Sequence, residues 1–276
     1  DNECLMGGSK ADVLLGVAGR DRLIGGSGDD ALRGEGGKDV LKGNGGDDTL
    51  LVTTQDSVDG GKQFDTADFG DFGRSMLMTT NYEGSWRVEN GEGKTLATLK
   101  NVEKIVGTFR GDAYIGGFKN IVLEGLGGDD RIIPGLARNR VEGGDGNDTF
   151  YLGGAKFDSI TGGADIDTFE INSDERLDTH YRGNFSNTKR EVRISDFDGS
   201  ENGDKLVFRD FLRPFKNEND LLNSAMAVGN DTVFEIGRLR VVLEDYALGD
   251  FLEDEAKRAD LLSLEFTPTF LEPDLF

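Results

Sequence analysis

Aspartates recur at a fixed spacing near the start of the chain, each followed two positions later by a leucine. From Gly7 to Leu51 the chain divides without a gap into nine-residue units that begin with glycine and carry aspartate at position six. These residues are Gly7, Gly16, Gly25, Gly34 and Gly43, with Asp12, Asp21, Asp30, Asp39 and Asp48. Carboxylates in phase with glycines, whose backbone is free to turn its carbonyls inward, supply the oxygen ligands that hard cations prefer. The pattern therefore predicts metal binding.

A second, less regular set of these units runs from Gly107 to Glu170, with one extra residue at Leu152. Its position-six residues are Asp112, Ile121, Asp130, Asn139, Asp148, Asp158 and Asp167. A lone unit between the two sets, Gly60–Asp68, carries Asp65. Position eight is apolar in every unit of both sets, so each unit joins a polar loop to a short strand with one inward side chain.

Calcium fits this spacing better than magnesium does. Six loop residues and three strand residues make half a coil, so loops eighteen residues apart stack on one side. Stacked strands lie ~4.8 Å apart, and calcium accepts oxygens at about 2.3–2.6 Å, so one ion can reach two loops. Magnesium requires shorter bonds and keeps its waters. Glycine-rich carbonyls would complete the shell, with candidates at Gly25, Gly34, Gly43, Gly125, Gly127, Gly143 and Gly162.

Alternation between the two sides of the coil predicts which loops bind ions. In the first set, one side carries Asp12, Asp30 and Asp48, and the other carries Asp21 and Asp39. In the second set, one side carries Asp112, Asp130, Asp148 and Asp167, and the other carries Ile121, Asn139 and Asp158. We expect about six calcium ions, with the latter side mostly empty.

Ion binding is expected to be coupled to folding. One leucine in nine residues buries too little apolar surface to offset the conformational entropy of an ordered unit. Rows of like-charged aspartates add repulsion. The repeats should therefore be largely unfolded without a cation.

The nonapeptides resemble the G-G-x-G-x-D-x-U-x repeat of RTX proteins, which binds calcium in a parallel β-roll. The segment Lys100–Gly117 is similar to one that restarts repeat blocks in that family. Ile194–Phe208 and Gly229–Tyr246 resemble its C-terminal β-caps, as in serralysin-type proteases and the R-modules of alginate epimerases. The resemblance implies an extracellular protein of Gram-negative type, exported by a type I secretion apparatus. Asp274, Leu275 and Phe276 fit loosely to the C-terminal export signal of such proteins.

The predicted fold is all-β, with two parallel β-roll blocks, a β-hairpin linker and a C-terminal β-cap. We expect a first block over 1–68, a hairpin linker over 69–106, a second block over 107–170 and the cap over 171–276. Strand-like runs in the linker, which we expect to close the end of the first block, are Met76–Thr80, Trp86–Glu89 and Leu96–Val102. A short helix is expected near Asp220–Met226, and Asp254–Leu262 has helical spacing.

Composition excludes several other classes. The 276 residues carry 31 basic and 53 acidic side chains, a net charge of −22 that disfavours nucleic acid as a partner. The single cysteine, Cys4, excludes an internal disulfide framework, and the single histidine, His180, is expected at the surface. Asp196–Asp204 alternates like an EF-hand loop, but Glu201 and Val207 replace its glycine and final glutamate, which favours a solvated turn. No apolar run is long enough to span a membrane.

Three functions remain to be compared. The first is a non-catalytic, calcium-dependent folding and secretion module of a larger exported protein. The second is a binding module for anionic polysaccharide, or a surface adhesin, with a candidate basic patch at Lys119, Arg138, Arg140 and Lys156. The third, an enzyme, is disfavoured because neither an H-E-x-x-H nor a G-x-S-x-G motif occurs.

Overall fold

The computed structural model describes residues 1–81, 83–172, 189–200, 203–209, 218–252 and 262–265. Two compact units divide the chain, Asp1–Gly128 and Asp129–Phe276. The structure does not test the predicted four-part division, which stays a prediction. Among the described residues, no helix combines the length and the hydropathy that crossing a bilayer requires.

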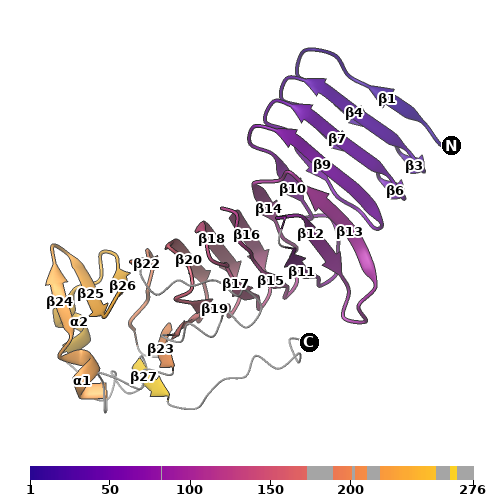
Figure 1. Cartoon of the computed structure of the whole chain (residues 1–276). Coiled ribbons are helices and arrows are strands. Elements are labelled where there is room, and N and C mark those ends of the chain that lie inside the picture. Colours follow the sequence, from indigo (N-terminus) through magenta and orange to yellow (C-terminus); the bar gives the residue numbers. More distant parts are fainter. Residues whose placement is uncertain (82, 173–188, 201–202, 210–217, 253–261, 266–276) are drawn as a thin grey trace. The chain divides into compact units, whose positions relative to one another are not determined.

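The first unit is a coil of short parallel strands arranged in two sheets (Figure 1). One sheet has the order β1 (Cys4–Met6), β4 (Arg22–Ser27), β7 (Val40–Gly45), β9 (Asp56–Lys62), β13 (Thr95–Lys100), β12 (Trp86–Glu89), β11 (Leu77–Thr80) and β15 (Ala113–Ile115). The other has the order β2 (Val13–Leu15), β5 (Ala31–Arg33), β8 (Thr49–Leu51), β10 (Thr66–Asp68), β14 (Lys104–Val106) and β16 (Val122–Gly127). Two minor strands, β3 (Ala18–Gly19) and β6 (Gly36–Gly37), pair separately.

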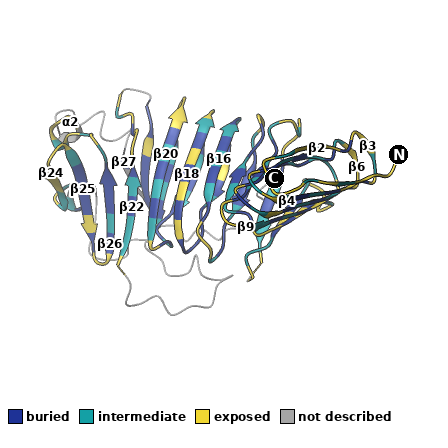
Figure 2. Cartoon of the chain, turned by 90° about the horizontal axis from the view of Figure 1, so that it is seen from above, coloured by how far each residue is buried: buried dark blue, intermediate teal, exposed yellow. Residues whose placement is uncertain are grey.

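Strands that pair in successive coils are two nine-residue repeats apart in the sequence, as the period predicts. Val13 lies opposite Ala31, and Arg22 lies opposite Val40. The leucine column points inward, and Leu23, Leu32, Leu41 and Leu50 are fully buried. Figure 2 shows buried residues in succession with intermediate and exposed ones along the strands. The predicted β-roll architecture is therefore confirmed.

The antiparallel segment of the first unit is built into the coil. The three strand-like runs form β11, β12 and β13, which pair antiparallel with one another. Strand β13 also pairs parallel with β9, and β11 pairs parallel with β15. Strand β13 thus covers the edge of β9 at the end of the first block, and the sheet continues through β12 and β11 to β15, which the sequence did not predict.

The second unit continues the same design with a larger apolar interior. One sheet has the order β17 (Arg131–Ile133), β19 (Thr149–Leu152), β21 (Thr168–Asn172), β23 (Lys205–Arg209) and β27 (Leu262–Glu265). The other has the order β18 (Arg138–Asp145), β20 (Phe157–Ala164), β22 (Arg190–Ile194), β26 (Leu239–Leu243), β25 (Asp231–Ile236) and β24 (Ala225–Val228). Phe150 and Phe169 stack in the inward column with ring centroids 5.1 Å apart. Phe208 contacts Phe234 at 5.4 Å. At Phe150 and Phe169, aromatic rings thus take the place that leucine has in the first unit, beside aliphatic Ile132, Val141 and Ile160.

Two short helices accompany the last strands. Helix α1 (Glu218–Leu222) overlaps only the first part of the helix expected near Asp220–Met226, because Met226 already belongs to strand β24; helix α2 (Leu248–Leu252) was not predicted. The expected helical stretch Asp254–Leu262 lies outside the described residues except for Leu262, which begins β27. His180 and the C-terminal Asp274–Phe276 also lie outside the described residues.

Candidate metal sites

The position-six aspartates form columns in which each carboxylate holds the preceding coil. One oxygen, Oδ1, accepts the backbone N–H of the aspartate one coil earlier. Asp12 donates to Asp30 at 2.8 Å, Asp30 to Asp48 at 2.8 Å, and Asp48 to Asp65 at 2.9 Å. On the other side, Asp21 donates to Asp39 at 2.7 Å and Asp39 to Asp56 at 3.0 Å. In the second unit, Asp130 donates to Asp148, Asp148 to Asp167, and Asp167 to Asp204.

The second oxygen, Oδ2, is buried and lacks a hydrogen-bond partner in seven of these aspartates, as far as the described residues show. They are Asp21, Asp30, Asp39, Asp48, Asp65, Asp148 and Asp167. Each of these residues is no more than 2% exposed. A buried, unpartnered carboxylate oxygen is costly unless a cation or donor meets it. The columns therefore offer a row of oxygens that fit a metal ion.

Position-one glycine explains how a second oxygen reaches the same space. A Cβ on Gly43 would collide with Asp48 Oδ2 and with the carbonyl oxygen of Gly60 in the next coil. Gly143 shows the same pair of contacts, with Asp148 Oδ2 and the Gly162 carbonyl. Glycine is thus required because a carboxylate and a carbonyl converge where its side chain would lie. Both oxygen types are ligands that calcium accepts.

The predicted glycines divide into two groups. Gly25, Gly34, Gly43, Gly143 and Gly162 each face the Oδ2 of the aspartate in their own unit. Gly125 and Gly127 are buried in β16, and the Gly125 carbonyl lies beside Gly107.

Burial makes several of these carboxyls weaker acids, with a raised pKa. It raises the pKa of Asp65 and Asp148 to about 7 and that of Asp167 to about 8, against the hydrogen bonds that their Oδ1 atoms accept. Neighbouring carboxylates raise them further, such as Asp204 and Asp148 beside Asp167. A cation at Oδ2 would reverse this effect, because it favours the charged form.

At four other column positions Oδ2 already accepts a hydrogen bond. Gly8 N–H donates to Asp12, and Asp198 N–H donates to Asp204. Asp56 accepts both the N–H and the hydroxyl of Thr53. Asp112 accepts the N–H and hydroxyl of Thr108 and the hydroxyl of Tyr114. Here protein donors occupy the position that a cation would take, so the geometry favours a hydrogen-bonded role for Asp112 over the expected ligand role.

The opposite side of the second unit differs. Asn139 donates its Nδ2 to Asp158 Oδ1 at 2.9 Å, and burial raises the pKa of Asp158 to about 7. Asp158 thus pairs with an amide, while Ile121 in the first unit is simply buried.

Sequence reasoning missed Asp56, Glu103 and the column position of Asp204. Each precedes an apolar residue by two positions, as the repeat aspartates do: Val58, Ile105 and Leu206. That shorter pattern, acidic residue then apolar residue, would have found them without the glycines. The segment from Asp196 is no EF-hand in its described part: both oxygens of Asp196 accept N–H groups of Gly162 and Gly163.

No group of three or more histidine, cysteine, aspartate or glutamate side chains gathers within the described part of the chain. Backbone carbonyls of the glycine-rich loops are the other oxygen ligands beside each column.

The fold and the columns define a parallel β-roll with cation-binding loops. Comparison with protein families agrees: a model of the RTX calcium-binding nonapeptide repeat matches residues 6–41, 15–50 and 124–154. The chain thus carries RTX calcium-binding repeats. A search of curated proteins finds no match.

Among solved structures, the chain is similar to the extracellular lipase LipA from Serratia marcescens. The TM-score is 0.28 at 16% sequence identity, and the likeness covers 95% of this chain and 40% of that chain. The chain therefore spans well under half the length of that protein.

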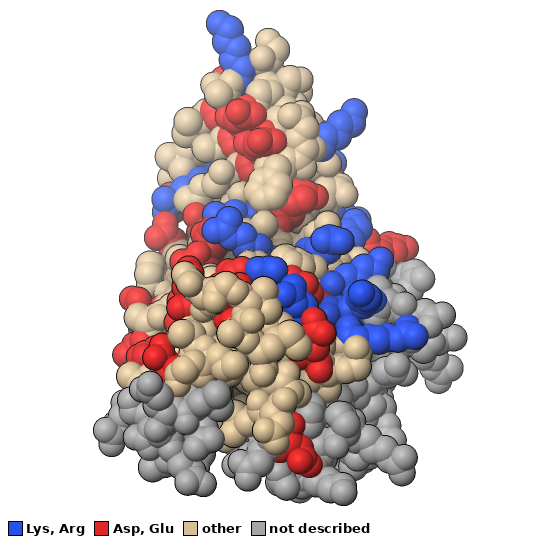
Figure 3. Space-filling model, turned by 90° about the vertical axis from the view of Figure 1, so that its left-hand side faces the viewer, with Lys and Arg blue, Asp and Glu red and all other residues tan. Residues whose placement is uncertain are grey.

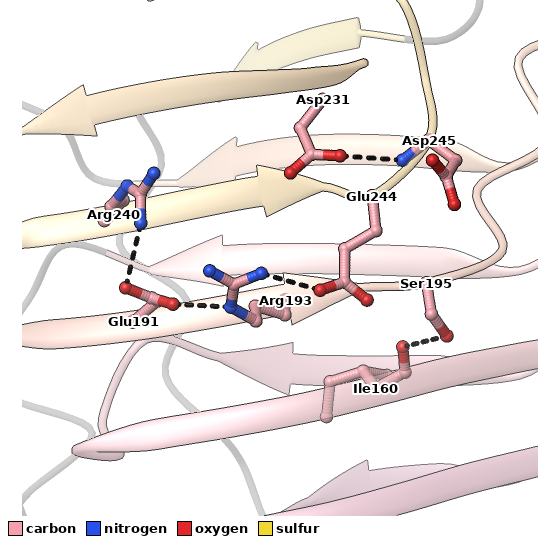
Figure 4. Close-up of polar contacts among 8 residues, drawn as sticks. All are labelled: Ile160, Glu191, Arg193, Ser195, Asp231, Arg240, Glu244 and Asp245. Carbon is pink, nitrogen blue, oxygen red and sulfur yellow. Dashed lines mark hydrogen bonds and ion pairs between the residues drawn. The ribbon is translucent and has the colours of Figure 1, made fainter. Parts of the chain in front are cut away.

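Several charged side chains of the second unit form ion pairs around strands β22 and β26. Arg193 lies between Glu191 and Glu244 at 2.6 and 2.7 Å, and Arg240 contacts Glu191 at 3.2 Å (Figure 4). Acidic and basic groups also alternate on the face seen in Figure 3. These ion pairs link strand β22 to strand β26 and to the residue that follows it, Glu244.

Proposed function

We propose that the chain is a calcium-dependent folding module of a larger exported bacterial protein, unfolded at the low calcium of the cytosol and wound outside the cell. The observation that carries this proposal is the set of seven buried aspartate oxygens without a described partner. Extracellular modules with oxygen ligands bind calcium at about 10⁻⁴–10⁻³ M, which suits a switch between the two compartments. The net charge of −22 opposes compaction until cations arrive.

We place one ion beside each of those seven aspartates, in place of the six expected from the sequence. Three lie in the column of Asp30, two in the column of Asp21 and two in the column of Asp148. In this proposal the repeats bind the ions by aligning aspartate carboxylate oxygens with backbone carbonyl oxygens. A non-catalytic role for the repeats follows from this, and any activity belongs to other parts of the parent protein.

Far-UV circular dichroism during a calcium titration tests the folding proposal. After exhaustive chelation, the spectrum should lose most of its strand signal, regain it in millimolar calcium and stay unchanged in equal magnesium. A native spectrum that survives chelation would refute the proposal.

Export is a separate step of the proposal, supported by the resemblance to RTX proteins. A type I secretion apparatus would carry the unfolded chain, and the extracellular location follows. Secretion of a fusion to the chain from a bacterial host with and without that apparatus tests this step. Equal release by both hosts would contradict it.

Polysaccharide binding is a weaker second candidate. Arg138 and Arg140 lie exposed on β18, with the guanidinium of Arg138 5.9 Å from the Phe157 ring centre, and Lys156 is exposed nearby in sequence. Lys119 belongs to the other compact unit. Alginate titration in millimolar calcium distinguishes the candidates, because only a binding module would give saturable binding that Arg140→Ser weakens.

A further inference from the structure

The turn between β13 and β14, outside any nonapeptide, imitates a repeat loop. Asp65 N–H donates to Glu103 Oε2 at 3.0 Å across 38 residues. At the corresponding place in the preceding coils, the acceptor is the Oδ1 of a repeat aspartate, as where Asp48 donates to Asp65. The carbonyl of Asp65 in turn accepts the N–H groups of Glu103 and Lys104 at 3.0 Å. Glu103 thus occupies the next position of the aspartate column.

A backbone oxygen is also placed as in a repeat. A Cβ on Gly60 would collide with Asp65 Oδ2 and with the carbonyl oxygen of Asn101. At Gly43 the equivalent pair is Asp48 Oδ2 and the Gly60 carbonyl. The Asn101 carbonyl therefore takes the place of a position-one glycine carbonyl.

The carboxylate that faces this space has no counter-charge. Asp65 is 0% exposed, and its Oδ2 finds no hydrogen-bond partner in the described chain. Burial raises the pKa of Asp65, and repulsion from Asp48, Glu103 and Asp47 adds to the effect. The neighbouring Lys104 pairs with Glu124 at 2.6 Å and not with Glu103. Two carboxylates and a carbonyl thus converge without a cation from the protein.

We propose that calcium binds between the Gly60–Asp65 loop and the Asn101–Glu103 segment, with Asp65, Glu103 and the Asn101 carbonyl among its ligands. The inference rests on the proposed function and deepens it: the ion is the one placed beside Asp65, and its two new ligands, Glu103 and the Asn101 carbonyl, lie outside the nonapeptide pattern. Such an ion ties the two ends of the 38-residue detour that contains β11, β12 and β13. It therefore makes the docking of the antiparallel strands dependent on calcium.

Two readouts test the site in the full chain. Isothermal titration with calcium counts the ions, and Trp86 emission follows the detour, because Trp86 is the only tryptophan and pairs with Leu99 of β13. Glu103→Gln keeps an oxygen that can accept the Asp65 N–H but removes the charge. We expect this variant to bind one ion fewer than the parent and its Trp86 transition to need about tenfold more calcium. Glu92→Gln, an exposed residue between β12 and β13, is the matched control and should behave as the parent.

The outcomes separate the two proposals. If Glu103→Gln binds as many ions as the parent with the same Trp86 midpoint, Glu103 is only a hydrogen-bond acceptor and the site is refuted. If the parent itself binds no calcium, the proposed function fails instead. Should Glu103→Gln not fold, Glu103→Asp decides: recovery of the parent's ion count supports the site, and its absence overturns it.

Discussion

The two oxygens differ in their contacts in the seven aspartates whose Oδ2 is buried without a described partner. Oδ1 fastens the preceding coil through its backbone N–H, and Oδ2 faces the glycine carbonyl of the following coil, as at Asp48. The first contact needs only an acceptor, whereas the second leaves negative charge buried without a described partner. An Asp→Asn substitution, which keeps one oxygen and replaces the other, should therefore separate the hydrogen bond between coils from calcium binding.

Asp148→Asn should have opposite effects with and without calcium. In chelator the variant should be more stable than the parent by about 1–3 kcal/mol, because it removes a buried, unpaired charge. In millimolar calcium it should be less stable and bind fewer ions. Urea unfolding in both buffers measures the two effects. The control, Asp145→Asn, removes the same charge from an exposed position of the same loop and should change neither. Destabilisation of Asp148→Asn in both buffers would contradict the argument.

The pH dependence should also reverse with calcium. Burial raises the pKa of Asp65 and Asp148 to about 7 and of Asp167 to about 8, from 3.8. A raised carboxyl pKa favours the folded state at low pH, and this stability is lost as pH rises from about 4 through 7–8. The chelated protein should thus gain strand signal between pH 8 and pH 5.

Calcium requires the deprotonated carboxylates, so its affinity should fall over the same interval. Titrations at pH 8 and pH 6, followed by circular dichroism, should show a higher calcium midpoint at pH 6. Equal midpoints would mean that these carboxyls do not ligate the ion.

At the scale of elements, the columns end where side-chain donors replace the cation. Thr53 closes the column of Asp21, Asp39 and Asp56, because its hydroxyl contacts both Asp56 Oδ2 at 2.9 Å and the Glu35 carbonyl. Tyr114 and Thr108 do the same at Asp112. These two positions, at Asp56 and Asp112, should thus be independent of calcium, in contrast to the one at Glu103.

Thr53→Val should destabilise the calcium-loaded protein by about 1–2 kcal/mol, since a buried carboxylate loses a donor at constant side-chain shape. Thermal unfolding in millimolar calcium measures this loss. Thr54→Val alters the neighbouring residue, for whose hydroxyl the structure shows no hydrogen bond, and should leave the transition temperature unchanged. Equal effects of the two variants would remove the capping role from Thr53.

Strand positions were predictable from the sequence to different degrees. Inward residues such as Leu32 and Leu41 follow from the period alone, as does the alternation of Asp30 and Asp39 between sides. The insertion of β11–β13 into the sheet was not predictable, because nothing in Met76–Val102 specifies a parallel partner on either edge. Glu103 escaped notice for the same reason: its role arises from a contact across 38 residues.

At the scale of the molecule, the two units differ in what holds them together. The repeats of the first unit depend on one leucine per half-coil and on buried carboxylates such as Asp30. The last strands of the second unit depend on apolar contacts, with Val241, Val242 and Leu243 consecutive and buried in β26. Removing calcium should therefore affect the two regions unequally.

Hydrogen exchange in chelator should show this difference. Amides of β25 and β26 should keep part of their protection, whereas those of β4 and β7 should exchange at nearly unfolded rates. In millimolar calcium, both regions should be protected. Uniform loss or uniform retention of protection in chelator would contradict the distinction between the two regions.

At Asn139 and Asp158, two successive coils are joined by a hydrogen bond from a side-chain amide to a carboxylate. An amide brings its own donor, so asparagine alternating with aspartate could interlock coils in any buffer. A polypeptide built that way would fold before export, whereas a secretion channel carries the unfolded chain. In the proposed module, dependence on calcium would thus reside in one side-chain oxygen per loop, set beside the carbonyls of the same backbone.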